Sequence, residues 1–411
     1  MHAFIISNVL PNRIYTGGQV LNKMISNLNE INFNLIWLNQ FNLPPFEDLP
    51  TNCKMLTQYK FESSKSINFM QRAWDKIGII AILRPIIYVL RGIVLCINLS
   101  PKIIKIILLI KLRKPDSVWM VAQGDKLIII YFFISLLFKK STVLVLHQWD
   151  PISWWLNARG YPQWYFKFIQ KILDKIEFDV ALNIVPSESW QRKLKLENKK
   201  ALHVDNFFLD SQFDFRYIHY SYSNNLSVVF IGQLYAGKEL EKICELLEKY
   251  QEYSGAIVTL HYFGGASQDK IGNIPIISHG FFDADDLTRE ISIYDVALLP
   301  YPMSEGLKET AELSFPSKCR QYMLAGLPIF AYAPLYSGVH IFLNTFLDKE
   351  SYFNGATLEN SFLFLDELMG RNFEERKRLH LISRDIARVH FSESAEMNPF
   401  QMKLKKLIKN E

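Results

Sequence analysis

The residue best suited to bind a phosphate group is a lysine at the expected start of a helix. Pro316, Ser317 and Lys318 precede a helix-forming stretch that ends at Gly326, and Pro328 opens the next strand. Proline is tolerated at a helix start because its missing N–H has no partner there. The N–H groups of Ser317 and Lys318, the lysine charge and the helix dipole would together attract an anion. The spacing therefore predicts a diphosphate site, with an ordinary capped helix as the alternative.

Lys238 and the glycine pair Gly17-Gly18 are further candidates for contacts with a phosphate or a sugar. Lys238 falls at the first turn of an expected helix, and the glycines end the predicted loop after the first strand. Glycines let backbone N–H groups approach a ligand closely. A surface lysine and a plain tight turn are the alternatives, so these signals depend on the motifs around them.

Polar and aromatic residues gather after the apolar run 144–146. His147 ends a predicted strand, where functional residues of α/β folds collect, and a structural histidine is the alternative. Asp150 follows closely and could act as a general base if the reaction inverts configuration. Half of the eight tryptophans lie here, at positions 149, 154, 155 and 164. They suit sugar stacking, with Trp154 assigned to the acceptor, but equally a membrane interface or core filling.

Strands and helices alternate in both halves of the chain, which predicts an α/β fold with two doubly wound, Rossmann-like domains. The ligand site is expected in the cleft between them, beyond the carboxyl ends of the strands. We expect an N-terminal acceptor domain over 1–216, a linker over 217–225, a nucleotide-sugar domain over 226–390 and a final helix, 391–411, that crosses back. The predicted strands are 3–7, 33–38, 118–122, 142–146, 179–185, 228–232, 257–263, 274–277, 296–299 and 329–331, and helical patterns cover 19–28, 239–250 and 287–293.

The segment 314–330 resembles the donor-binding segment of GT-B glycosyltransferases, especially the retaining family 4. Those enzymes often show P-x-K followed by E-Y-M-A-x-G-x-P-V, and this chain has PSK at 316–318 followed by QYMLAGLPI at 321–329. The layout fits nearly the whole chain, but the motifs are sharp only in its C-terminal part. The resemblance implies transfer of a sugar from a nucleoside-diphosphate sugar to a glycan or lipid-linked acceptor in cell-envelope polysaccharide synthesis. It also implies retention of configuration. No metal is needed if the lysines and the helix terminus neutralise the diphosphate, and no cofactor is expected besides the donor substrate.

The same resemblance assigns roles to individual residues. It places Lys238 and Lys318 on the departing diphosphate and His147 against the donor sugar. It takes 280–282 as the loop that reads the nucleotide base. The predicted catalytic residues are thus His147, Lys238 and Lys318, the predicted acceptor contacts are Asp150 and Trp154, and the predicted donor contacts are Gly17, Gly18, Gln233, Phe282, Glu305, Ser314, Ser317 and Gln321.

Two substitutions weaken the charge that the family places around its donor. The family's second glutamate, which holds the ribose hydroxyls, is Gln321 here, and an amide bonds hydroxyls without a charge. Gln233 stands where arginine is common, so Lys318 would have to supply the missing positive charge.

The position of the family's first glutamate is ambiguous. Leu313 stands where that glutamate should lie. Glu305 resembles the usual Glu-Gly start of that motif, displaced by a longer loop, and we take it as the sugar-hydroxyl contact. Glu309 and Glu312 are competitors.

Metal-binding patterns are weak in this sequence. Asp283-Ala284-Asp285 looks like the D-x-D metal motif of the other major glycosyltransferase fold, but aspartates also cap a helix such as the one predicted over 287–293. The four cysteines lie far apart and form no C-x-x-C pair, so neither a zinc site nor a disulfide framework is predicted. Reduced thiols in a cytoplasmic protein are the simpler interpretation.

Residues 65–114 are both apolar and basic, with ten Lys and Arg against one acid. Positions 76, 84, 91 and 98 form one narrow polar stripe on a helix. The stretch 77–99 is long enough to cross a bilayer, but two central arginines and Pro85 argue against a crossing. We therefore expect an in-plane amphipathic helix on the anionic inner face of the cell membrane. A helix hairpin packed on the domain is the alternative.

The net charge of +5 is unevenly distributed along the chain. Residues 1–205 carry 26 Lys and Arg against 14 Asp and Glu, whereas the remainder carries 20 against 27. The basic half suits nucleic acid, an anionic membrane or a phosphorylated substrate, and solvated lysines without a partner are the alternative. Nucleic acid is not predicted, because the charge lies among aliphatic residues with few interleaved aromatics.

Two other functions stay open. A nucleotide-sugar 2-epimerase has a similar fold, but it would leave the apolar basic segment without a purpose. A non-catalytic sugar- or membrane-binding relative is favoured by Leu313 and Gln321. The sequence identifies neither the base, the sugar, the acceptor and its linkage, nor the oligomeric state.

Overall fold

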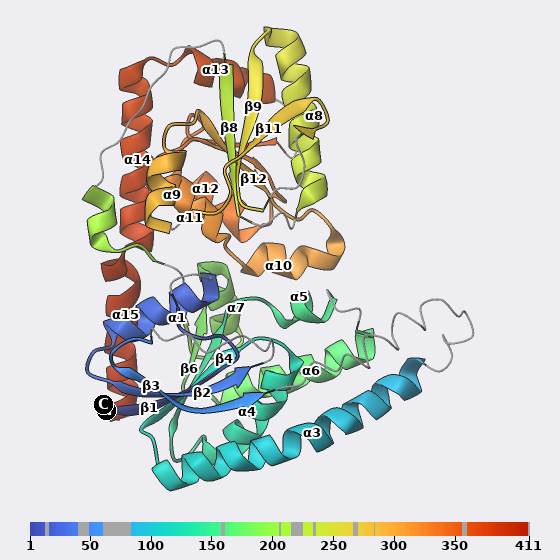
Figure 1. Ribbon diagram of the computed structural model, residues 1–411, viewed down its shortest axis with the longest axis vertical. Helices are drawn as coiled ribbons and strands as arrows, with labels where there is room; N and C mark the ends of the chain where they lie inside the picture. The colour runs from blue at the N-terminus through green and yellow to red at the C-terminus, as the bar shows by residue number, and fades with distance from the viewer. Residues whose placement is uncertain are drawn as a thin grey trace. The chain divides into compact units, whose positions relative to one another are not determined.

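The computed structural model describes residues 1–12, 16–39, 49–60, 84–157, 161–204, 207–214, 225–232, 236–265, 270–282, 284–355 and 360–409. Its contacts divide the chain into two compact units (Figure 1). The N-terminal unit comprises Met1–Val185, Lys193–Leu202 and Gln401–Glu411, and the C-terminal unit comprises Pro186–Arg192 and His203–Phe400. The predicted linker lies, except for its last residue, outside the described ranges.

The N-terminal unit is built on a seven-stranded sheet in the order β3-β2-β1-β4-β5-β6-β7. The ladders from β3 through β6 are parallel. A strand such as β4 is buried along its whole length, because a parallel sheet carries helices on both faces. The strands are β1 (His2–Ser7), β2 (Asn32–Asn39), β3 (Cys53–Lys60), β4 (Ser117–Ala122), β5 (Val143–Gln148), β6 (Leu182–Val185) and β7 (Ala201–His203), and the helices are α1 (Thr16–Asn27), α3 (Arg84–Arg113), α4 (Asp125–Phe138), α5 (Ile152–Asn157), α6 (Gln163–Asp179) and α7 (Glu188–Leu196), whose first residues belong to the C-terminal unit.

Helices α3 and α4 lie on one face of this sheet, and α1 lies on the other (Figure 1). Right-handed crossovers require this arrangement. The chain passes from β1 to β2 in one direction along the sheet, but from β3 to β4 and on to β5 in the other. Apolar side chains of α3, α4 and α6 share one core with the central strands.

The C-terminal unit repeats the architecture with the strand order β10-β11-β9-β8-β12-β13-β14. Its ladders are parallel except for β10 with β11. The strands are β8 (Asn225–Ile231), β9 (Ile257–Phe263), β10 (Lys270–Ile271), β11 (Ile274–Ser278), β12 (Val296–Pro300), β13 (Ile329–Tyr332) and β14 (Tyr352–Asn354). The helices are η2 (Asp210–Asp214), α8 (Gly237–Ser254), α9 (Ala284–Ile291), η3 (Glu305–Leu307), α10 (Lys308–Leu313), α11 (Ser317–Leu324), α12 (Gly338–Phe346), α13 (Ser361–Gly370), α14 (Phe373–Phe391) and α15 (Glu393–Lys409), whose last turns belong to the N-terminal unit.

The α/β class and the two doubly wound sheets are confirmed, and each predicted strand is present at least in part. The strand predicted over 179–185 is shorter, because Asp179 still belongs to α6. Helix α1 begins at Thr16, so the glycine pair occupies its first turn rather than the loop before it. The longer loop in which the sequence places Glu305 is partly helical, with η3 and α10 inside it.

Candidate active site

The predicted lysines lie beyond the point where the strand order of the C-terminal sheet reverses, between β8 and β12. Helix α8 begins soon after β8, and α11 begins after β12, so both N-termini lie at the carboxyl edge of the sheet. Neither N-cap residue, Ala236 or Pro316, forms a side-chain cap. The positive ends of two helix dipoles therefore meet the edge where ligands of doubly wound sheets bind.

Lys318 is the most unusual charged group at this edge. Lys318 is only 8% exposed, and its Nζ lies 4.3 Å from the centre of the Phe230 ring in β8. Burial lowers the pKa of Lys318 to about 7, because apolar surroundings disfavour the ammonium form. An anion that docks against this group would restore its charge. The arrangement is therefore suited to a phosphate ligand.

Tyr322 fixes α11 to the two central strands. Its hydroxyl donates to the carbonyl oxygen of Leu298 in β12 over 3.1 Å and accepts from the N–H of Ile231 in β8 over 3.0 Å. The hydroxyl thus lies where β8 and β12 part, and it holds α11 over the switch point. The sequence motif includes Tyr322 but assigns it no role. The sequence could have indicated this role, because the hydroxyl of a tyrosine in a buried helix requires hydrogen-bond partners.

Arg320 anchors the approach to α11 from the other side. Its guanidinium is fully buried and lies 5.1 Å from the ring centre of Phe315 and 4.8 Å from that of Phe391. Its Nη2 donates to the carbonyl oxygen of Pro186 over 3.2 Å. This residue holds the segment that leads into the helix, and sequence reasoning missed it.

Gln321 and Ser314 hold neighbouring elements together. The Nε2 of Gln321 donates to the hydroxyl of Thr288 in α9, and Gln321 itself is buried. The hydroxyl of Ser314 donates to a backbone carbonyl of α10 and accepts from the hydroxyl of Tyr301. Ser317 is exposed at the first position of α11. The predicted ribose and sugar contacts of these residues stay predictions.

The loop that carries Glu305 is tied to the start of α8. Glu239 accepts a hydrogen bond of 3.0 Å from the N–H of Met303. Lys238, the residue before Glu239, is exposed in the first turn of α8. Glu305 is exposed and pairs with Lys308 one turn further on, at 3.4 Å. Lys238 and the Glu305 loop therefore belong to the same corner of the sheet edge.

Phe282 belongs to an aromatic platform beside β9. Its ring meets that of Phe263 edge-on at 5.3 Å, and Phe263 stacks on His279 at 4.5 Å. Nε2 of His279 lies 2.9 Å from Nδ1 of His261. Burial lowers the pKa of both histidines, so at neutral pH one uncharged ring donates to the other. A platform of this kind suits a nucleotide base. Gln233 lies outside the described residues.

In the N-terminal unit, His147 is fully buried in β5 beside two tryptophans. Its ring centre lies 5.7 Å from that of Trp119 and 5.4 Å from that of Trp149. Its Nε2 accepts a hydrogen bond of 2.8 Å from Nε1 of Trp149. Burial lowers the pKa of His147 to about 3, so the ring is neutral near pH 7 and its proton is on Nδ1. The Nδ1 atom is buried, and a neutral ring cannot supply positive charge to a ligand.

The glycine pair at the start of α1 is required by packing. A Cβ on Gly17 would lie 2.6 Å from the Trp149 ring. On Gly18 it would lie 2.0 Å from the side-chain nitrogen of Asn12 and 2.7 Å from the carbonyl oxygen of Leu10. Steric contacts therefore explain why both positions are glycine. Their predicted contact with the donor stays a prediction.

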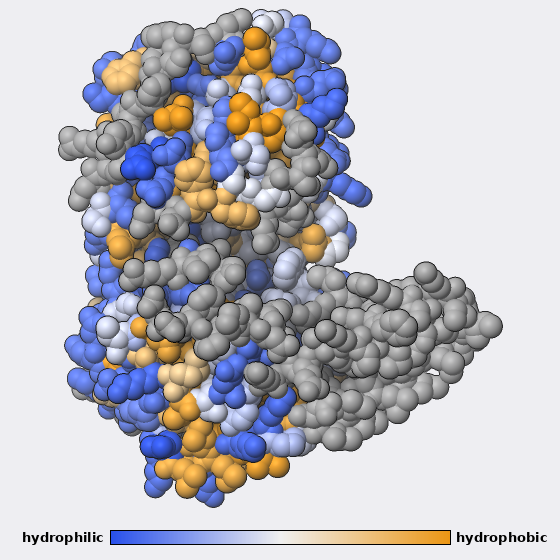
Figure 2. All heavy atoms as spheres, in the orientation of Figure 1, coloured by the Kyte–Doolittle hydropathy of each residue, from blue (hydrophilic) through white to orange (hydrophobic). Residues whose placement is uncertain are grey.

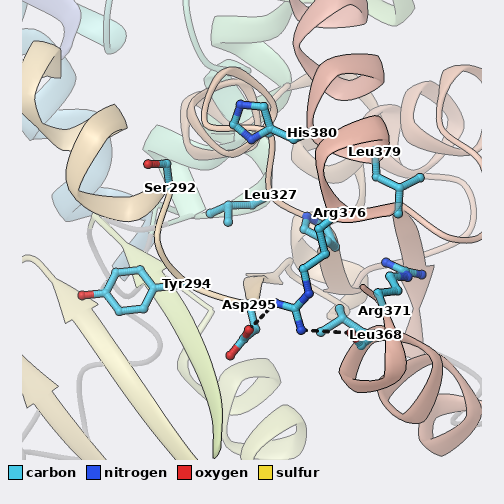
Figure 3. Close-up of a pocket in the computed structure, with 11 residues that line it drawn as sticks. Ser292, Tyr294, Asp295, Leu327, Leu368, Arg371, Arg376, Leu379 and His380 are labelled. Carbon is cyan, nitrogen blue, oxygen red and sulfur yellow. Dashed lines mark hydrogen bonds and ion pairs between the residues drawn. The ribbon is translucent and has the colours of Figure 1, made fainter. Parts of the chain in front are cut away.

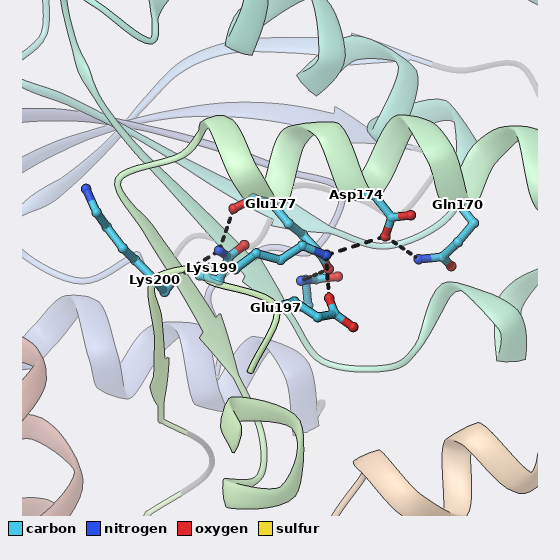
Figure 4. Close-up of polar contacts among 8 residues, drawn as sticks. Gln170, Asp174, Glu177, Glu197, Lys199 and Lys200 are labelled. Atoms are coloured by element: carbon cyan, nitrogen blue, oxygen red, sulfur yellow. Dashed lines mark hydrogen bonds and ion pairs between the residues drawn. The ribbon is translucent and has the colours of Figure 1, made fainter. Parts of the chain in front are cut away.

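A buried ion pair anchors the end of β5. Gln148, between His147 and Trp149, donates from Nε2 to Oε1 of Glu177 over 3.0 Å. The Nζ of Lys199 lies 2.7 Å from the other oxygen of Glu177 (Figure 4). Burial raises the pKa of Glu177, and Lys199 opposes that rise. The pair fixes the backbone that presents His147.

The predicted acceptor residues follow directly on the chain. Asp150 is partly buried just after β5. Trp154 in α5 is partly buried and meets Trp155 edge-on at 5.3 Å. Both residues lie beyond the carboxyl end of β5, where the fold places ligands, and their contact with an acceptor stays a prediction.

A small cavity of about 40 Å³ lies at the opposite edge of the C-terminal sheet (Figure 3). Asp295 and Pro328 line it, and they precede β12 and β13. Arg376 bridges Asp295 at 2.6 Å and donates to the carbonyl oxygen of Leu368 (Figure 3). A cavity of this size has room for a few water molecules but not for a nucleotide. It lies at the amino ends of β12 and β13, whereas Lys318 follows the carboxyl end of β12.

Within the described ranges, no group of three or more His, Cys, Asp or Glu side chains is arranged to hold a metal ion. Asp283 of the D-x-D pattern lies outside those ranges.

Comparisons with known proteins agree on the architecture. No protein-family model matches the sequence, and a search of curated proteins finds no match. Among solved structures, sucrose-phosphate synthase from Thermosynechococcus elongatus is similar with a TM-score of 0.65 at 10% identity, over 100% of both chains. Alpha,alpha-trehalose 6-phosphate synthase from Burkholderia multivorans is similar with a TM-score of 0.60 at 9% identity, over 100% of this chain and 96% of that one.

A third similar structure contains a nucleotide-sugar analogue. It is described as trehalose-6-phosphate from E. coli bound with UDP-2-fluoro glucose, and it matches with a TM-score of 0.59 at 12% identity, over 100% of this chain and 99% of that one. Identities this low establish architecture alone. The two doubly wound sheets and these similarities together show that the chain has the GT-B glycosyltransferase fold.

Proposed function

We propose that this protein is a glycosyltransferase that uses a nucleoside-diphosphate sugar. Its acceptor would be a glycan or a lipid-linked glycan in cell-envelope polysaccharide synthesis, on the cytoplasmic side of the membrane. The observation that carries the proposal is Lys318, a buried lysine at the N-terminus of α11, beyond the switch point of the sheet. The similar E. coli structure, which is bound with UDP-2-fluoro glucose, supports the choice of donor.

The positive groups at this edge match the charge that develops during sugar transfer. When the bond between the sugar and the diphosphate breaks, negative charge grows on the leaving phosphate oxygens. We assign the stabilisation of this charge to Lys318, Lys238 and the N-termini of α8 and α11, because preorganised cations and dipoles make the largest contribution to lowering such a barrier. The proposal therefore assigns this role to the protein rather than to a metal ion. Retention of configuration rests on the resemblance alone.

Calorimetric titration with UDP, GDP and dTDP tests the donor site, followed by assays with the sugars of the base that binds. We expect one of the three diphosphates to bind. Lys238→Gln should raise its dissociation constant by about tenfold, as for the loss of one charge-assisted hydrogen bond. Lys249→Gln is the matched control, because Lys249 is an exposed lysine on the same helix, far from its N-terminus. Binding of none of the three diphosphates would contradict the proposal. Epimerisation of the donor without an acceptor would favour the 2-epimerase instead.

A further inference from the structure

The C-terminal half of α3 is apolar on two opposite sides. Leu99, Ile103, Ile106 and Ile110 are buried in the core of the N-terminal unit. Ile104, Leu108 and Leu112 follow a second stripe, four residues apart, and are 55%, 50% and 78% exposed. A helix that only packs on its own domain is polar on its outer side. The outer stripe therefore needs another explanation.

Helix α4 extends this apolar surface. It packs against α3 on the same face of the sheet (Figure 1). Its inner side is buried, whereas Phe133, Leu136 and Leu137 are exposed. Figure 2 shows hydrophobic atoms gathered at the lower end of the N-terminal unit, where Figure 1 places the C-terminal part of α3. We name these six exposed residues of α3 and α4 the α3–α4 face.

Positive charge surrounds the α3–α4 face. On α3, Lys105, Lys111 and Arg113 are exposed beside these residues, and the helix contains no acid. Lys114 follows α3, and Lys139 and Lys140 follow α4. The neighbouring acid Asp179 is neutralised by Lys139 and Lys175, each at 2.9 Å. Exposed apolar side chains bordered by cations complement a lipid bilayer, which is apolar inside and can carry anionic headgroups at its surface.

We propose that the α3–α4 face docks on an anionic lipid bilayer. The apolar side chains of the α3–α4 face would insert between the lipid headgroups, while the neighbouring lysines would contact the lipid phosphates. Within the described residues, no helix is both long enough and apolar enough to cross a bilayer. The inner side of α3 is part of the core, so the helix stays docked and lies in the plane of the membrane. The sequence predicts this contact for residues 65–114, of which 65–83 lie outside the described residues. The proposal places it on 104–114 together with 133–140.

Vesicle co-sedimentation of the full chain tests this surface. At low salt we expect binding to vesicles of phosphatidylcholine with added phosphatidylglycerol, and much less to phosphatidylcholine alone. Leu108→Gln combined with Leu112→Gln should reduce partitioning by at least tenfold, since apolar insertion drives it. Replacing Lys111, Arg113 and Lys140 by Gln should cost about fivefold per charge, only on anionic vesicles. Leu363→Gln is the control, because Leu363 is equally exposed on α13 beside acidic residues.

The variants must first show unchanged melting curves and nucleotide binding, which separates docking from folding and from the proposed transfer reaction. A wild-type protein that does not co-sediment with anionic vesicles at low salt would overturn the proposal. So would normal vesicle binding by the leucine variant. A wild-type dimer that the leucine variant converts to monomer would show instead that a second copy covers this face.

Discussion

The carboxyl edges of the two sheets have the same topology but different chemistry. The C-terminal edge presents two helix N-termini and a buried lysine whose pKa lies at about 7. The N-terminal edge presents a neutral histidine between tryptophans and a helix start packed so tightly that only glycine fits. The first edge is suited to an anion, the second to uncharged rings and hydroxyls. The two edges therefore differ because the residues at the strand ends and helix starts differ, while the fold that carries them is the same.

Removing the buried charge of Lys318 should have the largest effect on the function proposed for the C-terminal edge. We expect Lys318→Met to lower turnover by roughly 100-fold or more, since leaving-group stabilisation is lost. The same change should raise the melting temperature at pH 7. The pKa of Lys318 in the folded protein lies below that of a free lysine, so the unfolded chain binds this proton more tightly. The free energy of unfolding is therefore reduced at every pH below the pKa of a free lysine, including pH 7. Turnover assays and calorimetric melting measure the two effects.

A lysine kept only for structure would give a different result. Lys318→Met would then melt at a lower temperature and would still transfer sugar. A gain in stability together with a loss of turnover identifies a residue that costs stability for the sake of function.

Crowding the N-terminal edge should have the opposite effect on stability. Gly18→Ala places a methyl group 2.7 Å from the carbonyl oxygen of Leu10, which cannot rotate away. We expect a loss of about 1–3 kcal/mol in the free energy of unfolding, the usual cost of overpacking. Gly370→Ala is the control, because no atom lies within 4 Å of its added Cβ. Denaturant titrations compare them, and equal midpoints would show that the first turn of α1 adjusts freely.

The difference between the two edges also explains what the sequence could predict. The strands, the helices and the position of Lys318 at a helix start follow from local signals: apolar runs, a proline before a helix and a glycine after it. The binding of an anion there stays a prediction. The buried state of Lys318 does not follow from such signals, because Phe230 lies almost ninety residues away in the chain. The same holds for Tyr322, which bridges two strands that are distant in sequence. Short edge strands such as β10 and β14 were not predicted, since two or three residues give no periodic pattern.

The steric role of the glycine pair was also beyond the sequence. Gly17 and Gly18 were expected in a loop, because glycine disfavours helix interiors. The structure places them in a helical turn against Trp149 and Asn12. A tertiary contact determines those residue types here, and no local rule can show it.

The smallest effect expected from the comparison is a pH dependence confined to the C-terminal edge. In the proposed donor site, Lys318 adds to the attraction of Lys238 and the helix N-termini only when it is protonated, and its pKa of about 7 means that roughly half of the molecules carry the proton at pH 7. The dissociation constant of the nucleotide sugar should therefore rise by up to about fivefold from pH 7 to pH 8 and change little below pH 6. A nucleotide sugar is the right probe, because its diphosphate, unlike a free terminal phosphate, does not titrate in this range. His147, with a pKa of about 3, contributes nothing to this slope. The dependence should vanish in Lys318→Met, and a slope that survives in this variant would move the titrating group away from α11.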